Sequence, residues 1–542
     1  MPTLFRGGTV VTNLPSLPVT DALAVHAGRV VALGADALDW SAHWDDVVDL
    51  NGRCLVPGFR DGHAHPLAAG IEMTSLELSD AGSVEAVLGA VAAWASTHPT
   101  DQWIVGAGHT TAILPDGIGD ATWLDAAVPD RPVVLTSNDH HTMWVNTAAL
   151  RAARIDSSTA DPAGGVIVRR GDGTPCGTLR EFGAIHLMQA AMPEVGAAAR
   201  DAGVTPCLTE LARHGIVWVQ DALVSADLLD TYLAAASADT LTCRFNLAFR
   251  AEPSRWRRQA DEFVAWRSRV ETAPAAGTWL AARTVKFFAD GVIEAGTGFL
   301  LEPYTDAPHT CGLPNWSPEE LAEAVRCFDA AGFQIHIHAI GDGGVRMALD
   351  AIEHAERCNG VADRRAVIAH TQLVHPDDLH RFTALGVIAN FEPLWSQLDP
   401  VMVELTIPRL GPHRSALQYQ IGTLARSGAH VSFGSDWPVS SVSPLAGMSV
   451  AVTRRTANGE PVGGWTPDER VPLLEAIAAY TAGTAYQAFE EVDRGTLAAG
   501  AWADLAVLAG DLTEIDGDEA RDVTVDQTIV AGITVHLSLI HI

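Results

Sequence analysis

The sequence predicts an α/β protein: a (β/α)8 TIM-like barrel, a small β-sandwich domain built from both termini, and an insertion after the first barrel strand. Three observations lead to this fold class. Short apolar segments alternate with helix-like stretches through the middle of the chain, β-rich segments lie near both ends, and one connection is too long for a loop. Alternating strands and helices indicate a parallel sheet with helices packed against it.

Residues 1–55 and 490–536 are expected to form the small domain. Both stretches contain runs of β-branched residues interrupted by Gly, such as ALAVHAGRVVALG near the start and TIVAGITVH near the end. This pattern is typical of small antiparallel sheets. Because the two stretches are alike and enclose everything else, we expect them to assemble into one domain. Residues 537–542 follow a completed strand and are assigned to no domain.

Residues 56–489 are expected to form the barrel. Eight apolar segments in this range end in polar residues, and helix-like stretches separate most of them; Ser317 and Glu320, at the start of one stretch, are spaced as a capping box. The segments lie near residue 60 and at 218–223, 243–250, 284–291, 333–342, 366–373, 386–393 and 430–438. In such a barrel the catalytic groups lie at the carboxyl ends of the strands.

Residues 70–205 separate the first and second predicted strands. A barrel of about 250 residues allots roughly 30 residues to each strand–helix unit, so this connection is far too long to be one unit. It is rich in Trp, Pro and Gly. We therefore expect an inserted subdomain of mixed, loop-rich structure that covers the mouth of the barrel.

Composition limits the partners of this 542-residue chain. It has 35 Lys and Arg against 66 Asp and Glu, a formal net charge of −31. Such a surface repels nucleic acids and anionic membranes, so neither is an expected partner. The seven cysteines contain no C-x-x-C motif, and the start lacks the layout of a signal peptide. We expect a cytoplasmic protein that acts on a small molecule, with a homodimer as the default assembly.

Metal-ligand residues end several of the predicted strands. His63 and His65 end the first; because side chains two residues apart in a strand point to the same side, the pair can bind one ion. Taken alone, each histidine could also be an ordinary buried core residue, and Asp436 could be a helix cap. Together, nitrogen and carboxylate donors at one end of a barrel form the set that Zn²⁺ prefers. The fifth, sixth and eighth strands end in His338, with His336 behind it, His370 and Asp436.

Lys286 lies within the apolar segment TVKFFADG of the fourth predicted strand. A buried lysine is costly unless it is paired, neutralised or modified. A salt-bridged lysine is the ordinary explanation. Beside metal ligands there is a second one: the amine reacts with carbon dioxide and becomes a carbamate, an anionic ligand that can bridge two metal ions.

Several long segments resemble one known family. They are GFRDGHAH, NDHHTMWVNTAALRAARI, VKFFADG, HIHAIGDGGVRMALDAIE, AHTQLVHPDD and GSDWPV, and the resemblance covers nearly the whole chain except the tail LSLIHI. They are similar to the amidohydrolase superfamily and, within it, to amidohydrolase family 3, which includes N-substituted formamide deformylases.

The resemblance implies a centre of two Zn²⁺ ions, although a single-metal site stays open. It places His63 and His65 on one ion, His338 and His370 on the other, Lys286 between them as a carbamate, and Asp436 as a ligand that handles protons. It also implies that His141 and Asn146 line the substrate pocket. Three further residues are expected there, with surface or loop packing as the ordinary alternative: Glu392, where the family has Gln, Trp395 and Trp437.

The expected reaction is hydrolysis of a non-peptide C–N bond in an N-substituted formamide, N-acyl amide, carbamate or cyclic amide. Asp436, Lys286 and His370 are the expected catalytic residues. The alternative within the superfamily is a one-metal deaminase acting on an aminated ring. Such deaminases carry Glu three residues after the histidine of the fifth strand, where this chain has Gly341. A non-catalytic relative is a third possibility, against which the complete ligand set argues.

Overall fold

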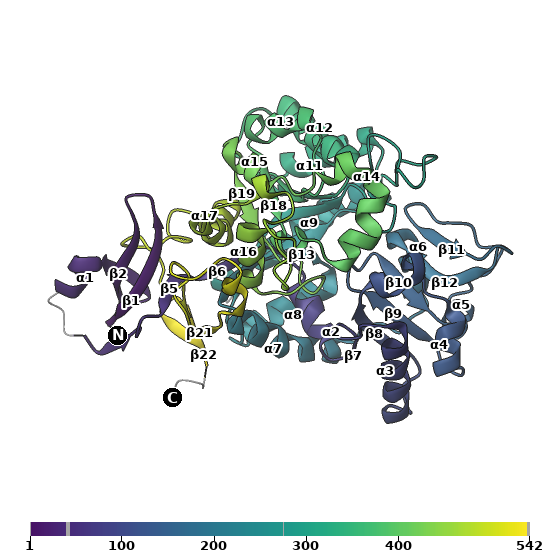
Figure 1. Ribbon diagram of the computed structural model, residues 1–542, viewed down its shortest axis with the longest axis horizontal. Helices are drawn as coiled ribbons and strands as arrows, with labels where there is room; N and C mark the ends of the chain where they lie inside the picture. The colour runs from purple at the N-terminus through teal and green to yellow at the C-terminus, as the bar shows by residue number, and fades with distance from the viewer. Residues whose placement is uncertain (1, 40–43, 275, 539–542) are drawn as a thin grey trace.

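The computed structural model describes residues 2–39, 44–274 and 276–538 (Figure 1). Strands in these ranges form a barrel, a six-stranded sheet within the insertion, and an eight-stranded sheet that combines the two ends of the chain. The last four residues of the predicted tail, 539–542, lie outside the described residues. In the described ranges, every helix is too short or too polar to cross a membrane.

Eight strands form the barrel, and each hydrogen-bonded pair of neighbours among them is parallel. This confirms the predicted (β/α)8 fold. In ring order the strands are β6 (Phe59–Ala64), β13 (Ile216–Val224), β14 (Arg244–Arg250), β15 (Leu280–Phe288), β16 (Gln334–Ala339), β17 (Val367–His370), β18 (Ile388–Phe391) and β19 (Val431–Phe433).

The first and last barrel strands meet just beyond their carboxyl ends. The backbone N–H of Asp436 donates to the carbonyl of His63 at 2.7 Å, and that of His65 donates to the carbonyl of Trp437 at 2.7 Å. These bonds close the ring where the predicted ligands of strands one and eight lie. The end of the barrel and the candidate site are therefore built by the same contacts.

Helices follow the barrel strands, and their buried apolar residues pack against the sheet. The predicted helix start at Ser317 is present, since the side chain of Ser317 accepts from the backbone N–H of Glu320 at 3.3 Å. The main helices are α7 (Ala197–Arg213), α8 (Ala226–Ser237), α9 (Trp256–Thr272), α11 (Pro318–Ala330), α12 (Asp342–Asn359), α13 (Leu379–Ala384), α15 (Ile421–Arg426) and α16 (Pro444–Thr453).

The insertion follows β6 and the short α2 (Pro66–Glu72). It is more regular than the loop-rich structure expected from its composition, because helices and a six-stranded sheet enclose two apolar clusters of its own. Its strands are β7 (Leu76–Glu77), β8 (Ile104–His109), β9 (Val133–Ser137), β10 (Thr142–Val145), β11 (Val166–Arg169) and β12 (Pro175–Arg180), with helices α3 (Val84–Thr97), α4 (Ala121–Ala127), α5 (Thr147–Ala152) and α6 (Glu181–Gln189).

The two ends of the chain share one sheet, joined where β5 pairs antiparallel with β20. Val30 and Ile529, from strands far apart in this sheet, belong to one apolar core, so the sheet folds over that core as a sandwich does. Its strands are β1 (Thr3–Leu14), β2 (Leu17–His26), β3 (Arg29–Leu33), β4 (Asp46–Asp49), β5 (Cys54–Pro57), β20 (Leu505–Leu508), β21 (Val525–Val530) and β22 (Ile533–Leu537).

Candidate active site

The end of β6 brings His63 and His65 to Asp436. The Nε2 atoms of the two histidines lie 3.4 and 3.0 Å from Oδ1 of Asp436. Asp61, two residues before His63, accepts from the backbone N–H of His63 at 3.0 Å and from that of Ser435 at 3.1 Å. Its carboxylate therefore ties the first strand to the segment that carries Asp436 and fixes both ligand groups at once.

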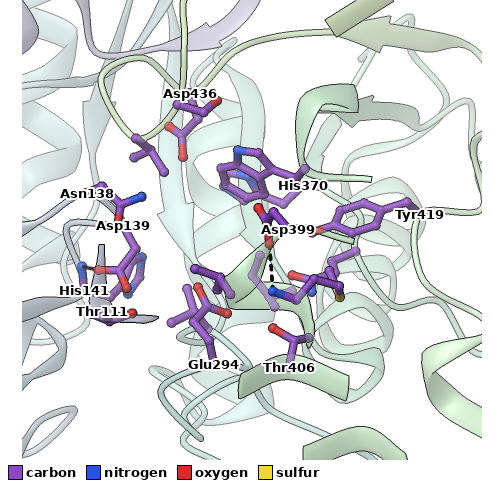
Figure 2. Close-up of a pocket in the computed structure, with 18 of the residues that line it drawn as sticks. Thr111, Asn138, Asp139, His141, Glu294, His370, Asp399, Thr406, Tyr419 and Asp436 are labelled. Atoms are coloured by element: carbon purple, nitrogen blue, oxygen red, sulfur yellow. Dashed lines mark hydrogen bonds between the residues drawn. The ribbon is translucent and has the colours of Figure 1, made fainter. Parts of the chain in front are cut away.

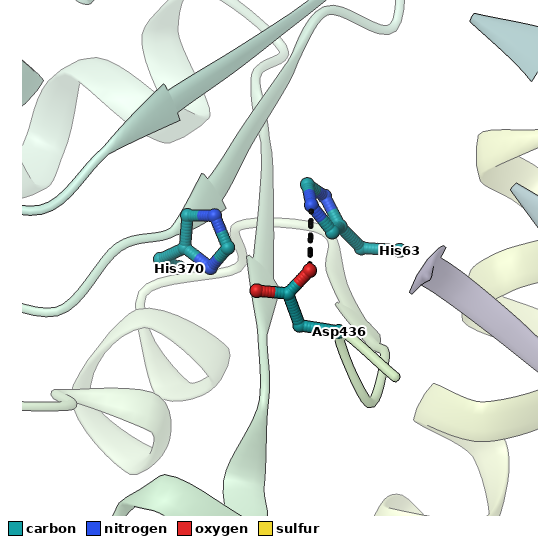
Figure 3. A group of neighbouring side chains, drawn as sticks. All are labelled: His63, His370 and Asp436. Atoms are coloured by element: carbon teal, nitrogen blue, oxygen red, sulfur yellow. Dashed lines mark ion pairs between the residues drawn. The ribbon is translucent and has the colours of Figure 1, made fainter. Parts of the chain in front are cut away.

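His370 and Asp436 both have left-handed backbone conformations, with φ of 72° and 53°. Non-glycine residues rarely adopt this conformation, and it concentrates at functional sites. The ligand atoms of His63, His370 and Asp436 all lie within 4.8 Å of one another and are buried (Figure 3). The strained strand ends thus bring donors from strands one, six and eight to a common point.

Lys286 is fully buried, with 0 % of its surface exposed, and its Nζ lies 3.0 Å from Nε2 of His63. Burial lowers the pKa of Lys286 to about 7, against the opposing effect of the Asp436 and Glu392 carboxylates. A substantial fraction of this amine is therefore uncharged near neutral pH, and the uncharged amine is the form that reacts with carbon dioxide.

The two histidines of β16 occupy different positions. Nε2 of His336 lies 2.7 Å from Nδ1 of His63, so His336 lies behind the first-strand ligand. The His338 ring packs 4.6 Å from that of His370, and its Nε2 lies 3.1 Å from the carbonyl oxygen of Gly291. Burial lowers the pKa of His63, His336 and His338 well below 6.5. Neutral imidazole is the form that binds a metal ion.

Glu392 lies behind His370. Its side chain has no exposed surface, and its Oε2 is 2.9 Å from Nδ1 of His370. This bond leaves Nε2 of His370 to face the cluster, in the carboxylate–histidine pairing typical of metal-ligating histidines. Glu392 is absent from the described residues that line the two cavities beside the cluster, in contrast to the pocket position expected from the sequence.

The cluster fits a divalent metal ion by its donor chemistry. Oδ1 of Asp436 is buried and has no hydrogen-bond partner of suitable geometry among the described residues. Nε2 of His65 lies only 3.0 Å from it. Despite burial, which acts in the opposite direction, His63 and His65 hold the pKa of the Asp436 carboxyl well below its usual range. Imidazole nitrogens and an ionised carboxylate that converge at one point are a suitable set of ligands for such an ion.

Two cavities of about 120 and 250 Å³ adjoin the cluster. Both are lined by His338, His370 and Asp436 from the barrel and by Asp139 and His141 from the insertion. Figure 2 shows four of these residues, His370, Asp436, Asp139 and His141, around the smaller cavity. The insertion therefore forms part of the wall of the space beside the cluster, and the ends of the barrel strands with the connections that follow them form the rest.

The remaining predicted pocket residues divide into two groups. His141 and Trp395 line a cavity, and the Trp395 ring stacks on the His370 ring at 5.3 Å with an interplanar angle of 3°. Asn146 instead caps α5 and binds backbone groups within the insertion, including the N–H groups of Val133 and Ala149. Trp437 belongs to the apolar core. Neither Asn146 nor Trp437 is among the described cavity-lining residues.

His141 forms an ion pair that the sequence did not predict. Its Nδ1 lies 2.8 Å from Oε2 of Glu181, which directly follows β12. Although burial lowers the pKa of His141, the Glu181 carboxylate raises it to about 9. No local motif marks Glu181. Asp61, in GFRDGHAH, and Asp290, in VKFFADG, are likewise outside the predicted set, although both lie inside motifs that indicate the site.

Asp290 fixes the loop after β16. Its carboxylate accepts from the backbone N–H groups of Phe299, Ile340 and Gly341 at 2.8, 3.0 and 2.8 Å. It is fully buried, and burial raises its pKa to about 7 despite these bonds. The carboxylate thus holds the backbone directly after His338.

Known proteins are similar to this chain over most of its length. The family model described as "Amidohydrolase family" matches residues 46–536. "Protein LONG AFTER FAR-RED 3" of Arabidopsis thaliana is 30% identical over 93% of this chain and 87% of its own, and "Putative amidohydrolase YtcJ" of Bacillus subtilis (strain 168) is 30% identical over 98% and 99%. "N-substituted formamide deformylase" of Arthrobacter pascens is 26% identical over 94% of each chain.

Solved structures match the fold. The crystal structure of an uncharacterised metal-dependent hydrolase from Pyrococcus horikoshii OT3 superposes with a TM-score of 0.74 at 22% identity, covering 95% of this chain and 99% of that one. The family model matches most of the sequence. The structure has the barrel that this match leads us to expect, with a cluster of histidines and Asp436 at the carboxyl ends of its strands. The chain belongs to the amidohydrolase family.

Proposed function

We propose that the chain is a metal-dependent hydrolase that cleaves a non-peptide C–N bond in a small N-substituted formamide, N-acyl amide, carbamate or cyclic amide. One observation carries the proposal: His63, His65, His370 and Asp436 meet in a buried cluster that opens into two cavities. The similarity to a protein named N-substituted formamide deformylase supports the choice of bond.

The residues of the cluster would hold Zn²⁺, in a centre of two ions. His63 and His65 on strand one, His338 and His370 on strands five and six, and Asp436 would provide the ligand atoms, with Lys286 as a bridging carbamate. Bound divalent ions supply two things to such a reaction: they lower the pKa of water and polarise a carbonyl group.

Asp436 is the residue best placed to carry the proton. It lines both cavities, and its carboxyl is held ionised by His63 and His65, so it can accept a proton from the attacking water. The same carboxyl then returns the proton to the leaving nitrogen, which must be protonated before it departs as an amine. One group can take both roles because amide hydrolysis adds the OH of water to the carbonyl carbon and its remaining proton to the nitrogen.

His141 can bind the carbonyl side of the substrate. Its Nδ1 is occupied by Glu181, which leaves Nε2 to donate within the cavity that His141 lines. A positively charged imidazole there stabilises the negative charge that develops on the carbonyl oxygen during attack. Trp395, fixed against His370, forms an apolar wall beside the same atoms.

The test combines metal content with a substrate panel. The purified chain, produced with zinc supplied, is analysed by mass spectrometry and assayed for amine release from N-alkyl formamides, N-acyl amides, carbamates and cyclic amides, with aminated heterocycles as a deaminase control. We expect about two metal ions per chain and release from at least one C–N class. One ion with ammonia release from a heterocycle would favour the deaminase alternative, and a chain that binds no metal after reconstitution would refute the proposal.

A further inference from the structure

The smaller cavity has an acidic end away from the metal cluster. Figure 2 shows Asp436 at one end of the cavity and Glu294 and Thr406 at the other. Asp399 and Tyr419 line it as well. Glu294 follows β15 in the chain, whereas Asp399 and Tyr419 belong to the long connection after β18. We call Glu294, Gln372, Asp399, Thr406 and Tyr419 the acidic lobe.

The carboxylates of this end are not neutralised by neighbouring cations. Arg409, the nearest arginine in sequence to this lobe, donates to the backbone carbonyl of Glu294 at 3.1 Å and pairs its guanidinium with Asp306 at 2.8 Å. Among the described residues that line the cavity there is no lysine or arginine. The charged imidazole in the lining, His141, is already paired with Glu181. The Glu294 and Asp399 carboxylates make no ion pair within the described ranges.

Glu294 is affected by its acidic neighbours. Burial, followed by the charges of Asp139 and Asp399, raises its pKa to about 7. Part of the Glu294 carboxyl is therefore protonated near neutral pH, and its ionised form is repelled by the neighbouring carboxylates in a poorly solvated space. A bound cation would relieve that repulsion, because it supplies the opposite charge that the surrounding protein lacks.

Two largely buried side chains of the same lobe line the cavity and have a polar atom without a hydrogen-bond partner. Tyr419 has only 2 % of its surface exposed, and its hydroxyl makes no hydrogen bond within the described structure. Gln372, 3 % exposed, donates from Nε2 to Oε1 of Gln418 at 2.8 Å, which leaves its own carbonyl oxygen without a donor. Buried polar groups normally have partners. Both residues line the cavity, so a ligand there would complete their hydrogen bonds.

Oδ1 of Asp399 already accepts from the backbone N–H of Met402 at 2.8 Å. The remaining partners that the acidic lobe offers are nearly all acceptors: the other carboxylate oxygens and an amide oxygen, with hydroxyls that can also accept. A ligand that satisfies them must be a donor with positive charge. The cavity walls also include Val292, Val401, Met402 and Trp395, which suit a carbon chain rather than a hydrated inorganic ion. An alkylammonium group combines the two properties.

We propose that the acidic lobe binds a protonated amine of the substrate, so that the preferred substrates are formamides or amides carrying an ammonium group at the end of an alkyl chain. The proposal rests on the proposed hydrolase function. It deepens that function by placing the scissile bond at the cluster of His370 and Asp436 and the charged end at Glu294 and Asp399.

The first measurement is binding to the zinc-loaded full chain at pH 7. Isothermal titration calorimetry compares n-butylammonium with 1-butanol and butyrate, on the wild type and on Glu294→Gln, Asp399→Asn and the double variant. We expect n-butylammonium to bind at least about tenfold more tightly than 1-butanol, and the preference to fall by a similar factor in each single variant, because hydrogen bonds to charged groups contribute on this scale. Glu319→Gln, an exposed change of equal charge on α11, should keep the preference.

The second measurement uses substrates. Formamides of ω-aminoalkyl chains with two to five methylenes are compared with N-alkyl formamides of equal length, and the ratio of kcat/KM for charged over neutral substrate is followed. We expect this ratio to exceed about ten at the best chain length and to fall towards one in the double variant.

The outcomes separate the two proposals. Hydrolysis of charged and neutral formamides at equal kcat/KM, without a binding preference, would overturn the acidic lobe and leave the hydrolase function standing. A binding preference that depends on Glu294 and Asp399, in a chain that hydrolyses none of the substrates, would support the lobe and count against the hydrolase function. A preference that survives in the double variant would overturn the assignment to these residues.

Discussion

Glu392→Leu tests whether the carboxylate behind His370 prepares this histidine to bind metal. Glu392 is completely buried, and its Oε2, 2.9 Å from Nδ1 of His370, is the contact that orients the imidazole. The other oxygen, Oε1, has no hydrogen-bond partner. Leucine is close to glutamate in size but accepts no hydrogen bond, so the variant removes this contact while keeping the space filled.

The expected loss is confined to metal binding. Replacing a carboxylate that orients a ligating histidine typically costs 10–100-fold in metal affinity, or about 1.4–2.8 kcal/mol. The metal-free protein should lose much less stability, because the substitution also removes a buried, unsatisfied oxygen whose burial was costly. Glu392→Gln is the matched control: its amide oxygen can still accept from Nδ1 of His370, so we expect most of the affinity to remain.

The assay is competition for Zn²⁺ between the protein and a chromophoric chelator, with circular dichroism and urea unfolding of each metal-free variant alongside. The reasoning predicts the affinity order wild type, then Glu392→Gln, then Glu392→Leu. If Glu392→Leu folds normally and binds Zn²⁺ as tightly as the wild type, Glu392 does not prepare His370, and the arrangement of His370 must come from its backbone and from Trp395.

Three further predictions address other parts of the site. Asp436→Asn should keep bound metal but lower kcat by about 10²–10⁴, the usual contribution of a general acid–base group, and near-normal kcat would remove Asp436 from that role. Lys286→Ala should lower activity by about tenfold or more, with partial recovery on adding propionate if a carbamate is the missing ligand; full activity without the acid would contradict it. Asp290→Ala should lower the free energy of unfolding by about 3 kcal/mol or more, because two buried backbone N–H groups and a half-buried one lose their acceptor. Urea unfolding with Asp290→Asn as the milder variant measures this, and an unchanged midpoint would show that the three groups find other partners.

Local pattern was enough to predict the barrel. Buried parallel strands are short apolar runs, and the segments around Lys286, His338 and His370 each end in polar residues, so their order along the chain also gives their order around the ring. The two-residue spacing of His63 and His65 on a strand likewise predicts that they share a side. The same reasoning predicted that the two ends of the chain share a sheet, because both ends contain the runs of β-branched residues and glycines that are typical of short antiparallel strands.

Roles that depend on side-chain direction needed the tertiary structure. Glu392 and Trp395 are three residues apart, yet one lies behind His370 and the other stacks on its ring within the cavity lining. Asn146 belongs to the expected motif, but its side chain forms hydrogen bonds with backbone groups of the insertion. Sequence spacing gives the position of a residue along an element, whereas which neighbour its polar atoms meet depends on how separate elements pack.

The sequence by itself determined the order of strands and the donor types at their ends, because both follow from hydrophobic periodicity and from the chemistry of single residues. The tertiary structure alone decided that Glu181 reaches His141 and that Glu294, Asp399 and Tyr419 share one cavity. These residues come from segments far apart in the chain. Their contacts arise from the closing of the barrel and the position of the insertion, which leave no periodic signal in any one segment.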